Sequence, residues 1–355
     1  MKKVLATILA LVMALSVTTM AWADDVAKIG NTGYATLKEA IEHVANGETI
    51  VLTANVNNGD GIVVASGKNF TLDFAGHTYT ITQNVVGSTG TESQCFQLLK
   101  ASTITMKDGA IVANCAGAKM IIQNYCNLTL DNMILDATAG NNNVGYVVSN
   151  NCGNVVIKNG TTITAKTTGV AFDVYGGFQN YGDVSVTLEA GATVNGKVEV
   201  ARDTGTQNKN TLTVTGGTVN GELAVTQNAK TEVAVTGGTF SSDVSAYAAG
   251  NTPVASNNGT YYVGAETIQN AANTLSAGQQ LKIEKGTVTI NGNTVTAGTS
   301  YTVPSRYYYY QPTTDTKTDN TKGSPKTFDA GIALYVGMAL TSAAGVAFVG
   351  KKRED

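Results

Sequence analysis

The residues best suited to chemistry lie in two short segments of the chain, VAFDVYGGFQNYGD (170–183) and VEVARDTGTQNK (198–209). The carboxylates, arginine and aromatic rings in them are Asp173, Tyr175, Phe178, Tyr181, Asp183, Arg202 and Asp203. Aromatic rings at a loop tip can stack on sugar rings while neighbouring carboxylates bind the hydroxyl groups. The segments therefore predict a shallow glycan-binding site. The alternative is that Phe172 and Phe178 pack inward and the tyrosines only cover a corner of the fold.

Other chemistries have little support in the sequence. His43 and His77 are the only histidines, so a Ser-His-Asp arrangement is not expected. The glycine pairs at 216–217 and 237–238 are not followed by the Gly-Lys-Ser/Thr of a phosphate-binding loop. Because the chain also contains no Cys-x-x-Cys, we expect no metal site and no cofactor.

A strand pattern recurs along the middle of the chain and predicts how these segments are positioned. It reads FTLDFAG, TITMKDG, LTLDNM, VVIKNG, SVTLEAG, LTVTGG and VAVTGG, anchored on Leu72, Met106, Leu130, Ile157, Leu188, Val214 and Val235. Each copy alternates apolar and polar residues and then breaks at Asn, Asp or Gly, which tolerate turn conformations. Repeats of this kind bury their apolar face by stacking. We therefore expect an all-β fold, a parallel β-helix over residues 48–262.

The residue after each anchor tests this register. In chain order these residues are Asp73, Lys107, Asp131, Lys158, Glu189, Thr215 and Thr236. If neighbouring turns lie about 4.8 Å apart, each charge has opposite charges on both sides. We interpret the column as a solvated ladder of ion pairs. The functional alternative makes Asp73 and Asp131 catalytic carboxylates, but the intervening Lys107 argues against a shared proton.

The four cysteines, Cys95, Cys115, Cys126 and Cys152, allow three disulfide pairings. Cys126 and Cys152 precede anchors of adjacent turns by four and five residues, which predicts that they lie near the same corner. We therefore expect a Cys126–Cys152 bond, with Cys95 and Cys115 as the remaining pair.

Both ends of the β-helix need covers, because open strand edges pair with other chains. In the N-terminal cap (24–47), Thr36 and Glu39 form a predicted capping box at the start of a helix that Gly47 ends. The segment ETIQNAANTLSAGQQLKI predicts a second helix and strand in a C-terminal cap (263–304). Residues 305–323 are rich in Thr, Asp and Lys and predict a flexible linker.

The sequences of the two termini predict targeting signals. Residues 1–23 have two lysines, an apolar run and Ala21-Trp22-Ala23, as a secretory signal peptide does. Residues 330–350 are uncharged and precede Lys351-Lys352-Arg353, which predicts a transmembrane helix with its basic tail inside. The formal net charge is −3, and the only arginines between these signals are Arg202 and Arg306. Nucleic acid is therefore not an expected partner.

Ser324-Pro325-Lys326-Thr327 resembles the Leu-Pro-x-Thr-Gly signal that sortases cut after Thr in Gram-positive surface proteins. The chain departs from that signal at Ser324, where Leu is usual, and at Phe328, where Gly is usual. The region 324–355 has the same order of signal, apolar span and basic tail. This resemblance implies a protein attached to the membrane or to cell-wall peptidoglycan, with sortase as a processing partner.

With the repeats over 30–262, the chain resembles right-handed parallel β-helix proteins of the pectate-lyase-like superfamily, in the form found as sorted surface proteins. This scaffold carries lyases, hydrolases, adhesins and stalks alike. We expect a non-enzymatic adhesin or stalk that binds glycans or proteins. The alternative is an anchored polysaccharide lyase or glycosidase, since such enzymes use acidic clusters with an Arg or Lys base or grouped aspartates. That alternative requires Asp173, Asp183 and Arg202 to meet in one cleft.

The sorting signal predicts a defined new carboxyl terminus. We expect cutting after Thr327, because Pro325 bends the chain and the apolar span with its basic tail holds it at the membrane. Mass spectrometry of cell-wall digests should find a peptide that ends at Thr327 and is joined to a wall fragment. Intact peptides spanning Lys326 to Lys351, recovered from membranes and absent from the wall, would instead indicate a plain transmembrane anchor.

Overall fold

The computed structural model describes residues 25–203, 205 and 207–305. The chain divides into two units, 1–306 and 307–355, and every described residue belongs to the first. The predicted signal peptide, the linker beyond residue 305, the sorting signal and the membrane span lie outside the described residues. Within those residues, the helices are too short or too polar to cross a bilayer.

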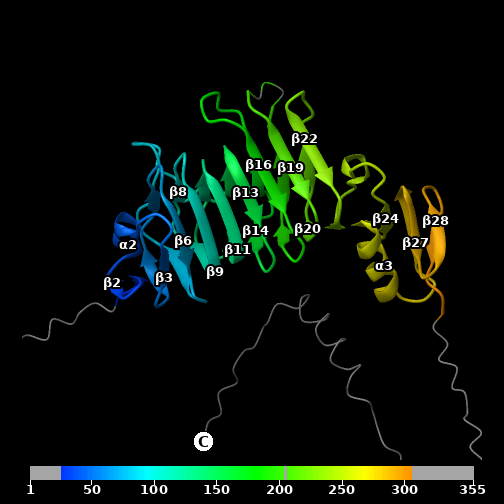
Figure 1. The fold of residues 1–355 in the computed structure, drawn as a ribbon, viewed down its shortest axis with the longest axis horizontal. Helices are drawn as coiled ribbons and strands as arrows, with labels where there is room; N and C mark the ends of the chain where they lie inside the picture. Colours follow the sequence, from blue (N-terminus) through cyan, green and yellow to red (C-terminus); the bar gives the residue numbers. More distant parts are fainter. Residues whose placement is uncertain (1–24, 204, 206, 306–355) are drawn as a thin grey trace, which may run out of the picture. The chain divides into compact units, whose positions relative to one another are not determined.

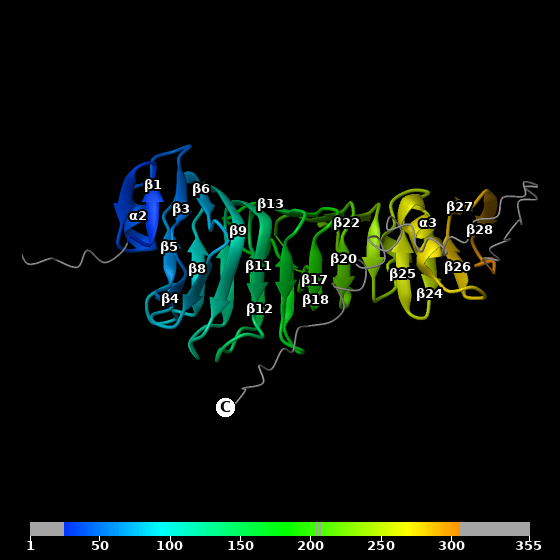
Figure 2. The same cartoon turned by 90° about the horizontal axis from the view of Figure 1, so that it is seen from below.

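The described chain consists largely of strands that stack in parallel on three faces (Figures 1 and 2). The first stack contains β3 (Thr49–Leu52), β6 (Asn69–Asp73), β9 (Thr103–Ala113), β11 (Asn127–Asp136), β13 (Gly153–Ile157), β16 (Val184–Leu188), β19 (Asn210–Val214) and β22 (Thr231–Val235). The second stack contains the later halves of β9 and β11 with β4 (Val56–Gly59), β7 (Thr78–Ile81), β14 (Thr162–Thr164), β17 (Thr193–Asn195), β20 (Thr218–Asn220) and β23 (Gly238–Phe240). The third stack contains β5 (Ile62–Val64), β8 (Gln94–Leu98), β10 (Met120–Asn124), β12 (Tyr146–Asn150), β15 (Val170–Val174), β18 (Lys197–Val200) and β21 (Leu223–Val225).

The register of the first stack agrees with the repeat. Each of the seven anchors, from Leu72 to Val235, pairs with the next one in chain order. All seven are buried. One further turn precedes them, because Ile50 of β3 pairs with Leu72. The repeat and its parallel stacking are thus confirmed, and they are compatible with a β-helix.

The corners between the first and second stacks use the residues that the sequence pattern marked. Asp108 and Asn132 have positive φ angles of 56° and 54°, and Asn132 Nδ2 donates to Asp108 Oδ1 at 2.9 Å. Later turns place glycine here. A Cβ on Gly237 would lie 2.4 Å from the carbonyl oxygen of Thr215, so only glycine allows neighbouring turns to approach this closely.

The first end of the coil carries a hairpin and a helix. Strands β1 (Ala27–Ile29) and β2 (Thr32–Tyr34) pair with each other, and β1 also pairs antiparallel with β3. Helix α2 (Leu37–His43) begins at Thr36, whose Oγ1 accepts from Glu39 N at 3.1 Å. The helix ends before the expected stop at Gly47, because the buried Val44 already has an extended conformation.

The other end repeats this scheme and adds three strands. The elements are η1 (Ser245–Tyr247), β24 (Val254–Asn257), β25 (Thr260–Val263), α3 (Ala265–Thr274), β26 (Gln280–Lys285), β27 (Thr287–Ile290), β28 (Asn293–Thr296) and β29 (Ser300–Thr302). Strand β24 pairs antiparallel with both β25 and β26, in the same way that β1 pairs with both β2 and β3. Buried residues of α3 and these strands form a second hydrophobic core, separate from that of the coil.

The predicted disulfides are not formed, and all four cysteines are free thiols. Cys126 and Cys152 do follow the register partners Asn124 and Asn150 by two residues each, so they lie on adjacent turns. Their thiols have other partners: Cys126 Sγ donates to Asn124 Oδ1 at 3.2 Å, and Cys152 Sγ donates to Tyr125 O at 3.0 Å. Burial, together with the nearby Cys152, raises the pKa of Cys126 to about 12. Cys95 and Cys115 are likewise unbonded, and burial raises the pKa of both.

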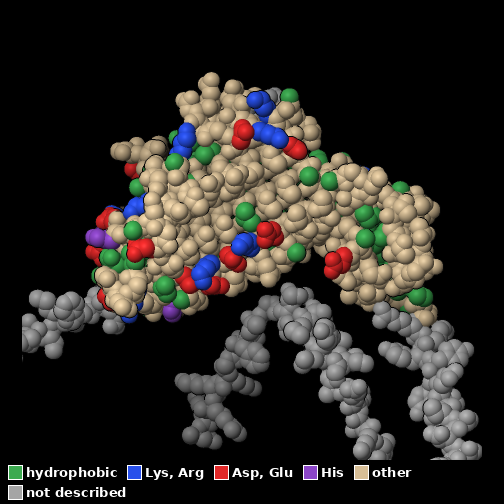
Figure 3. All heavy atoms as spheres, in the orientation of Figure 1, with side chains coloured by type: hydrophobic (Ala, Val, Ile, Leu, Met, Phe, Trp, Pro, Cys, Tyr) green, Lys and Arg blue, Asp and Glu red, His purple; other side chains and the backbone are tan. Residues whose placement is uncertain are grey.

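The predicted column of charges lies on the first stack and forms ion pairs in part: Asp73 with Lys107 and Asp131 with Lys158 are paired, whereas Lys107 has Asp108 in place of Asp131 as its second partner. Lys107 Nζ lies 2.7 Å from Asp73 Oδ2 and 2.9 Å from Asp108 Oδ2, and Lys158 Nζ lies 3.4 Å from Asp131 Oδ2. Figure 3 shows a row of alternating acidic and basic side chains on the molecule's surface. These side chains are between 20% and 43% exposed, so the column is a solvated ladder of weak ion pairs.

We expect Lys107→Glu to lower the free energy of unfolding by on the order of 1 kcal/mol, because it places like charges beside Asp73, Asp108 and Asp131 in a solvent-screened column. Thermal melts at low and high salt should show a loss that shrinks as salt rises. Lys119→Glu is the control, since Lys119 is exposed and has no ion pair among the described residues. A large, salt-insensitive loss would contradict the solvated ladder.

Candidate functional site

The predicted site forms at the corner that follows the third stack. The register of that stack aligns Leu98, Asn124, Asn150, Val174 and Val200 on consecutive turns. The residue after each strand donates its backbone N–H to the preceding turn, as Tyr125 N does to Leu98 O and Tyr175 N does to Asn150 O. This corner therefore places Tyr125 and Tyr175 two turns apart, with the buried Asn151 between them.

The insertion between β15 and β16, residues 175–183, adds two more rings to this corner. Phe178 and Tyr181 belong to one turn, closed by a bond from Tyr181 N to Phe178 O at 3.0 Å. Their rings contact the corner tyrosines. The centroid of Tyr181 lies 4.7 Å from that of Tyr125, and the centroid of Phe178 lies 5.8 Å from that of Tyr175. We call Tyr125, Tyr175, Phe178 and Tyr181 the aromatic cluster.

Contacts among the rings and with Lys100 fix the aromatic cluster in place, and two of its rings remain partly exposed to solvent. Phe178 contacts three of its rings, edge to face, at centroid distances of 5.8 to 6.3 Å. Lys100 Nζ, from an earlier turn, donates to Asn180 O at 2.6 Å and lies 5.6 Å from the Tyr181 ring centroid. Phe178 is 40% exposed and Tyr181 39% exposed. The inward packing that the alternative assigned to Phe178 is therefore wrong, whereas Phe172 is fully buried.

Arg202 joins the aromatic cluster to the sheet beneath it. Its guanidinium carbon lies 4.1 Å from the Tyr175 ring centroid and 5.1 Å from that of Tyr146. Its Nη2 lies 3.2 Å from Asp173 Oδ2. On the other side, Tyr175 Oη donates to Asp203 Oδ2 at 2.8 Å. The arginine thus fixes the orientation of Tyr175 through stacking, with a buried carboxylate as its anchor.

Asp173 is fully buried and faces hydrogen-bond donors. It accepts from Asn150 N at 2.6 Å and from Ser149 Oγ at 3.3 Å, in addition to Arg202. Burial raises the pKa of Asp173 to about 7, although Arg202 and the hydrogen bonds each lower it. A carboxylate in this position does not reach a ligand at the surface, so its role is to position Arg202.

The structure brings six of the seven predicted site residues together. Asp173, Tyr175, Phe178, Tyr181, Arg202 and Asp203 form one connected group. Asp183 has a different partner, since its Oδ1 accepts at 2.8 Å from Lys209 N, which lies 26 residues further along the chain. Asp173 and Asp183 therefore do not face one cleft with Arg202. Among the described residues, no group of three or more His, Cys, Asp or Glu side chains is placed to hold a metal ion.

Sequence reasoning missed several residues of this site. They are Lys100, Tyr125, Tyr146, Ser149 and Glu199. The first four come from turns that precede the predicted loop, whereas Glu199 lies within the segment 198–209 and was not among the predicted residues. Tyr146 Oη donates to Glu199 Oε2 at 3.1 Å, and Lys197 Nζ lies 2.9 Å from Glu199 Oε1. An alignment of the third-stack strands would have placed Tyr125 and Tyr175 at equivalent corners of the coil, and so would have added Tyr125 to the predicted site.

We expect Asp173→Asn to change how the free energy of unfolding depends on pH. The folded pKa of about 7 lies above the ~3.9 of an unfolded aspartate, so the folded protein binds a proton between these values. The contribution of Asp173 is therefore fully present below about pH 4 and is lost as the pH rises through about 7. Denaturant titrations across this range should show the wild type losing stability relative to the variant as the pH rises. A relative stability that increases with pH would contradict the raised pKa.

The chain was compared with protein-family models, with curated proteins and with solved structures. None of the three comparisons found a match. The aromatic cluster is therefore interpreted from its own geometry: exposed rings, locked in place by one another and by an arginine with a buried counter-ion.

Proposed function

We propose that this protein is an exported, surface-attached, right-handed β-helix of the pectate-lyase-like kind whose aromatic cluster binds glycans without catalysing a reaction. The observation that carries the proposal is the partial exposure of Phe178 and Tyr181 on a rigid base of tyrosines. Contact with water is unfavourable for large apolar rings. Stacking on the C–H face of a sugar ring would remove these rings from water.

Polar groups around the rings match the hydroxyl groups of a sugar. Each carboxylate oxygen has two lone pairs, so Glu199 can accept further hydrogen bonds besides those from Tyr146 and Lys197. The rings themselves are held by mutual edge-to-face contacts. Because the rings are already fixed, binding a ligand costs little side-chain entropy. This arrangement is suited to a rigid, shallow binding surface.

The same residue types also occur at protein-binding hot spots, which are rich in Tyr and Arg. A host or neighbouring protein is thus the other ligand class for this surface. We favour glycans because the exposed rings lie on a regular coil whose flanking corner residues are amide and carboxylate groups.

The enzymatic alternative, an anchored polysaccharide lyase or glycosidase, has no comparable support. Its carboxylates must reach the substrate, and a glycosidase needs two of them flanking the scissile bond. Asp173 is buried beneath Arg202, and Asp183 is bonded to the backbone of Lys209. We therefore propose binding rather than catalysis.

The proposed location at the cell surface is supported by the sequences of the two termini, which lie outside the described residues. A signal peptide at 1–23 would export the chain, and the sorting signal with the span at 330–350 would retain it at the membrane or on peptidoglycan after sortase processing. In this arrangement the linker 305–323 separates the β-helix from the surface. The coil then acts as a stalk that carries the aromatic cluster away from the cell.

We expect Tyr181→Ala and Phe178→Ala each to weaken glycan binding about fivefold or more, because each removes a stacking ring that contributes about 1 kcal/mol or more. A glycan array with the exported chain identifies the ligand, and titration of the strongest glycan measures the loss. Ile134→Ala is the matched control, since Ile134 is 50% exposed and lies on the second stack. Equal losses in the control and in the cluster variants, or an array with no hits, would contradict the proposal; binding to host proteins alone would favour the protein-ligand alternative.

A further inference from the structure

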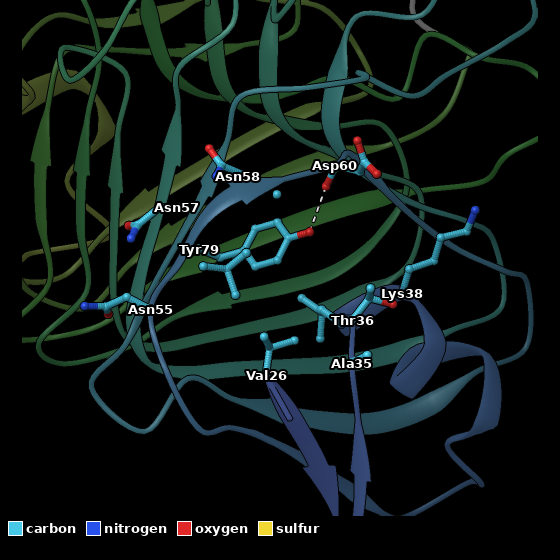
Figure 4. A pocket seen from close by; sticks show the side chains of 12 residues that line it. Val26, Ala35, Thr36, Lys38, Asn55, Asn57, Asn58, Asp60 and Tyr79 are labelled. Carbon is cyan, nitrogen blue, oxygen red and sulfur yellow. Dashed lines mark hydrogen bonds between the residues drawn. The ribbon is translucent and has the colours of Figure 1, made fainter. Parts of the chain in front are cut away.

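A second candidate site lies at the N-terminal end of the coil, on different elements from the aromatic cluster. An open cavity of about 340 Å³ lies between Val26, the start of α2, strand β4 and Tyr79 of β7. Figure 4 shows the ring of Tyr79 in the middle of its lining residues, with Val26 and Ala35 on one side and Asn57 and Asn58 on the other. The volume is near the lower end of the ~300–1,000 Å³ that small-molecule sites have.

A bulge in β4 gives this cavity its polar rim. Val56 pairs with Tyr79 and Gly59 pairs with Ile81, so three steps along β4 match two steps along β7. The extra residue places the side chains of Asn57 and Asn58 both in exposed positions, whereas neighbours in a regular strand face opposite sides. Bulges commonly re-aim side chains beside functional sites.

Several polar groups at this rim have no protein partner. Among the described residues, the side chains of Lys38, Asn57 and Asn58 make no hydrogen bond or ion pair with the protein. The other polar groups are already used in the fold. Asn55 Oδ1 accepts from Thr78 N at 2.9 Å, and Asp60 Oδ1 accepts from Asn84 Nδ2 at 3.2 Å. The bulge therefore presents two free carboxamides, each able to donate and to accept.

The base of the cavity is apolar and rigid. Tyr79 is buried, and its hydroxyl donates to Asp60 O at 2.9 Å. Burial raises the pKa of Tyr79, which keeps the phenol protonated in this bond. A Cβ on Gly59 would lie 2.6 Å from the Tyr79 ring, so the glycine lets the bulge rest directly on the aromatic ring. Val26 and Val56 complete this apolar surface.

We propose that this cavity binds one neutral polyhydroxylated ring, such as a single sugar residue. The partly exposed Val26 and Val56 can pack against the C–H face of such a ring, and the two free carboxamides can pair with hydroxyl groups that also both donate and accept. The two charged side chains, Lys38 and Asp60, have opposite signs, which favours a neutral ligand over an ion. The site is independent of the aromatic cluster and does not rest on the function proposed for it.

Saturation-transfer NMR with the purified full chain tests the proposal, using glucose, galactose, mannose and N-acetylglucosamine one at a time. At least one sugar should give a signal, and Asn57→Ala/Asn58→Ala should weaken its binding by about tenfold. Lys38→Ala, on the opposite side of the cavity, should also weaken it. Asn31→Ala, in the exposed β1–β2 turn, is the matched control and should bind as the wild type does. Thermal melts of all four proteins check that the fold is kept.

Tyr181→Ala separates this site from the aromatic cluster. It should leave binding of the single sugar unchanged even where it abolishes binding of a longer glycan. The proposal is overturned if no sugar gives a signal with the wild type, if the double variant and Lys38→Ala bind normally, or if Tyr181→Ala removes the signal. The last result would place the sugar on the aromatic cluster instead.

Discussion

The backbone ladder between successive turns is the constraint on which the rest of this structure depends. Each strand from β6 to β19 forms parallel hydrogen bonds with the turn before and the turn after it, and each anchor is the register partner of the next. A slip of one residue would turn every buried anchor outward, so the apolar column fixes the register. Once the register is fixed, the position of every outward side chain relative to its neighbours follows. The charge ladder and the tyrosines of the aromatic cluster are both products of this alignment.

The aromatic cluster shows how a regular coil can hold an irregular site. Tyr125 and Tyr175 occupy equivalent corners two turns apart, and the inserted turn with Phe178 and Tyr181 fills the space between them. Arg202 completes the group from the following turn, tied to a carboxylate that water does not reach. The regular coil therefore sets the spacing of Tyr125 and Tyr175, and the single insertion places Phe178 and Tyr181 where they are partly exposed. The aromatic cluster requires both features.

The parts of the fold that depend on periodicity were predictable from the sequence, and the parts that depend on side-chain direction were not. The anchors and the alternating charges recur in the first stack, so the pairing of Asp73 with Lys107 could be predicted from the sequence alone. The third stack has no comparable pattern around the site, because β15 is buried at every position and its Asp173 lies among apolar residues. Adjacent turns were correctly assigned to Cys126 and Cys152, yet their thiols face polar groups and not each other. The exposure of Phe178 depends on the path of the inserted turn, which composition does not encode.

The two ends of the coil have a consequence for its length. At each end, a hairpin followed by a helix and a third strand turns the parallel ladder into an antiparallel one: β1 with β3 at the start, and β23 with β25 at the finish. The sheet that holds the first two stacks therefore ends in antiparallel strands at both ends. A whole turn can in principle be added or removed between them, changing the height by about 4.8 Å while each cap meets the same kind of edge. The reach of such a protein is then a quantity that evolution can adjust in fixed increments, separately from what its loops bind.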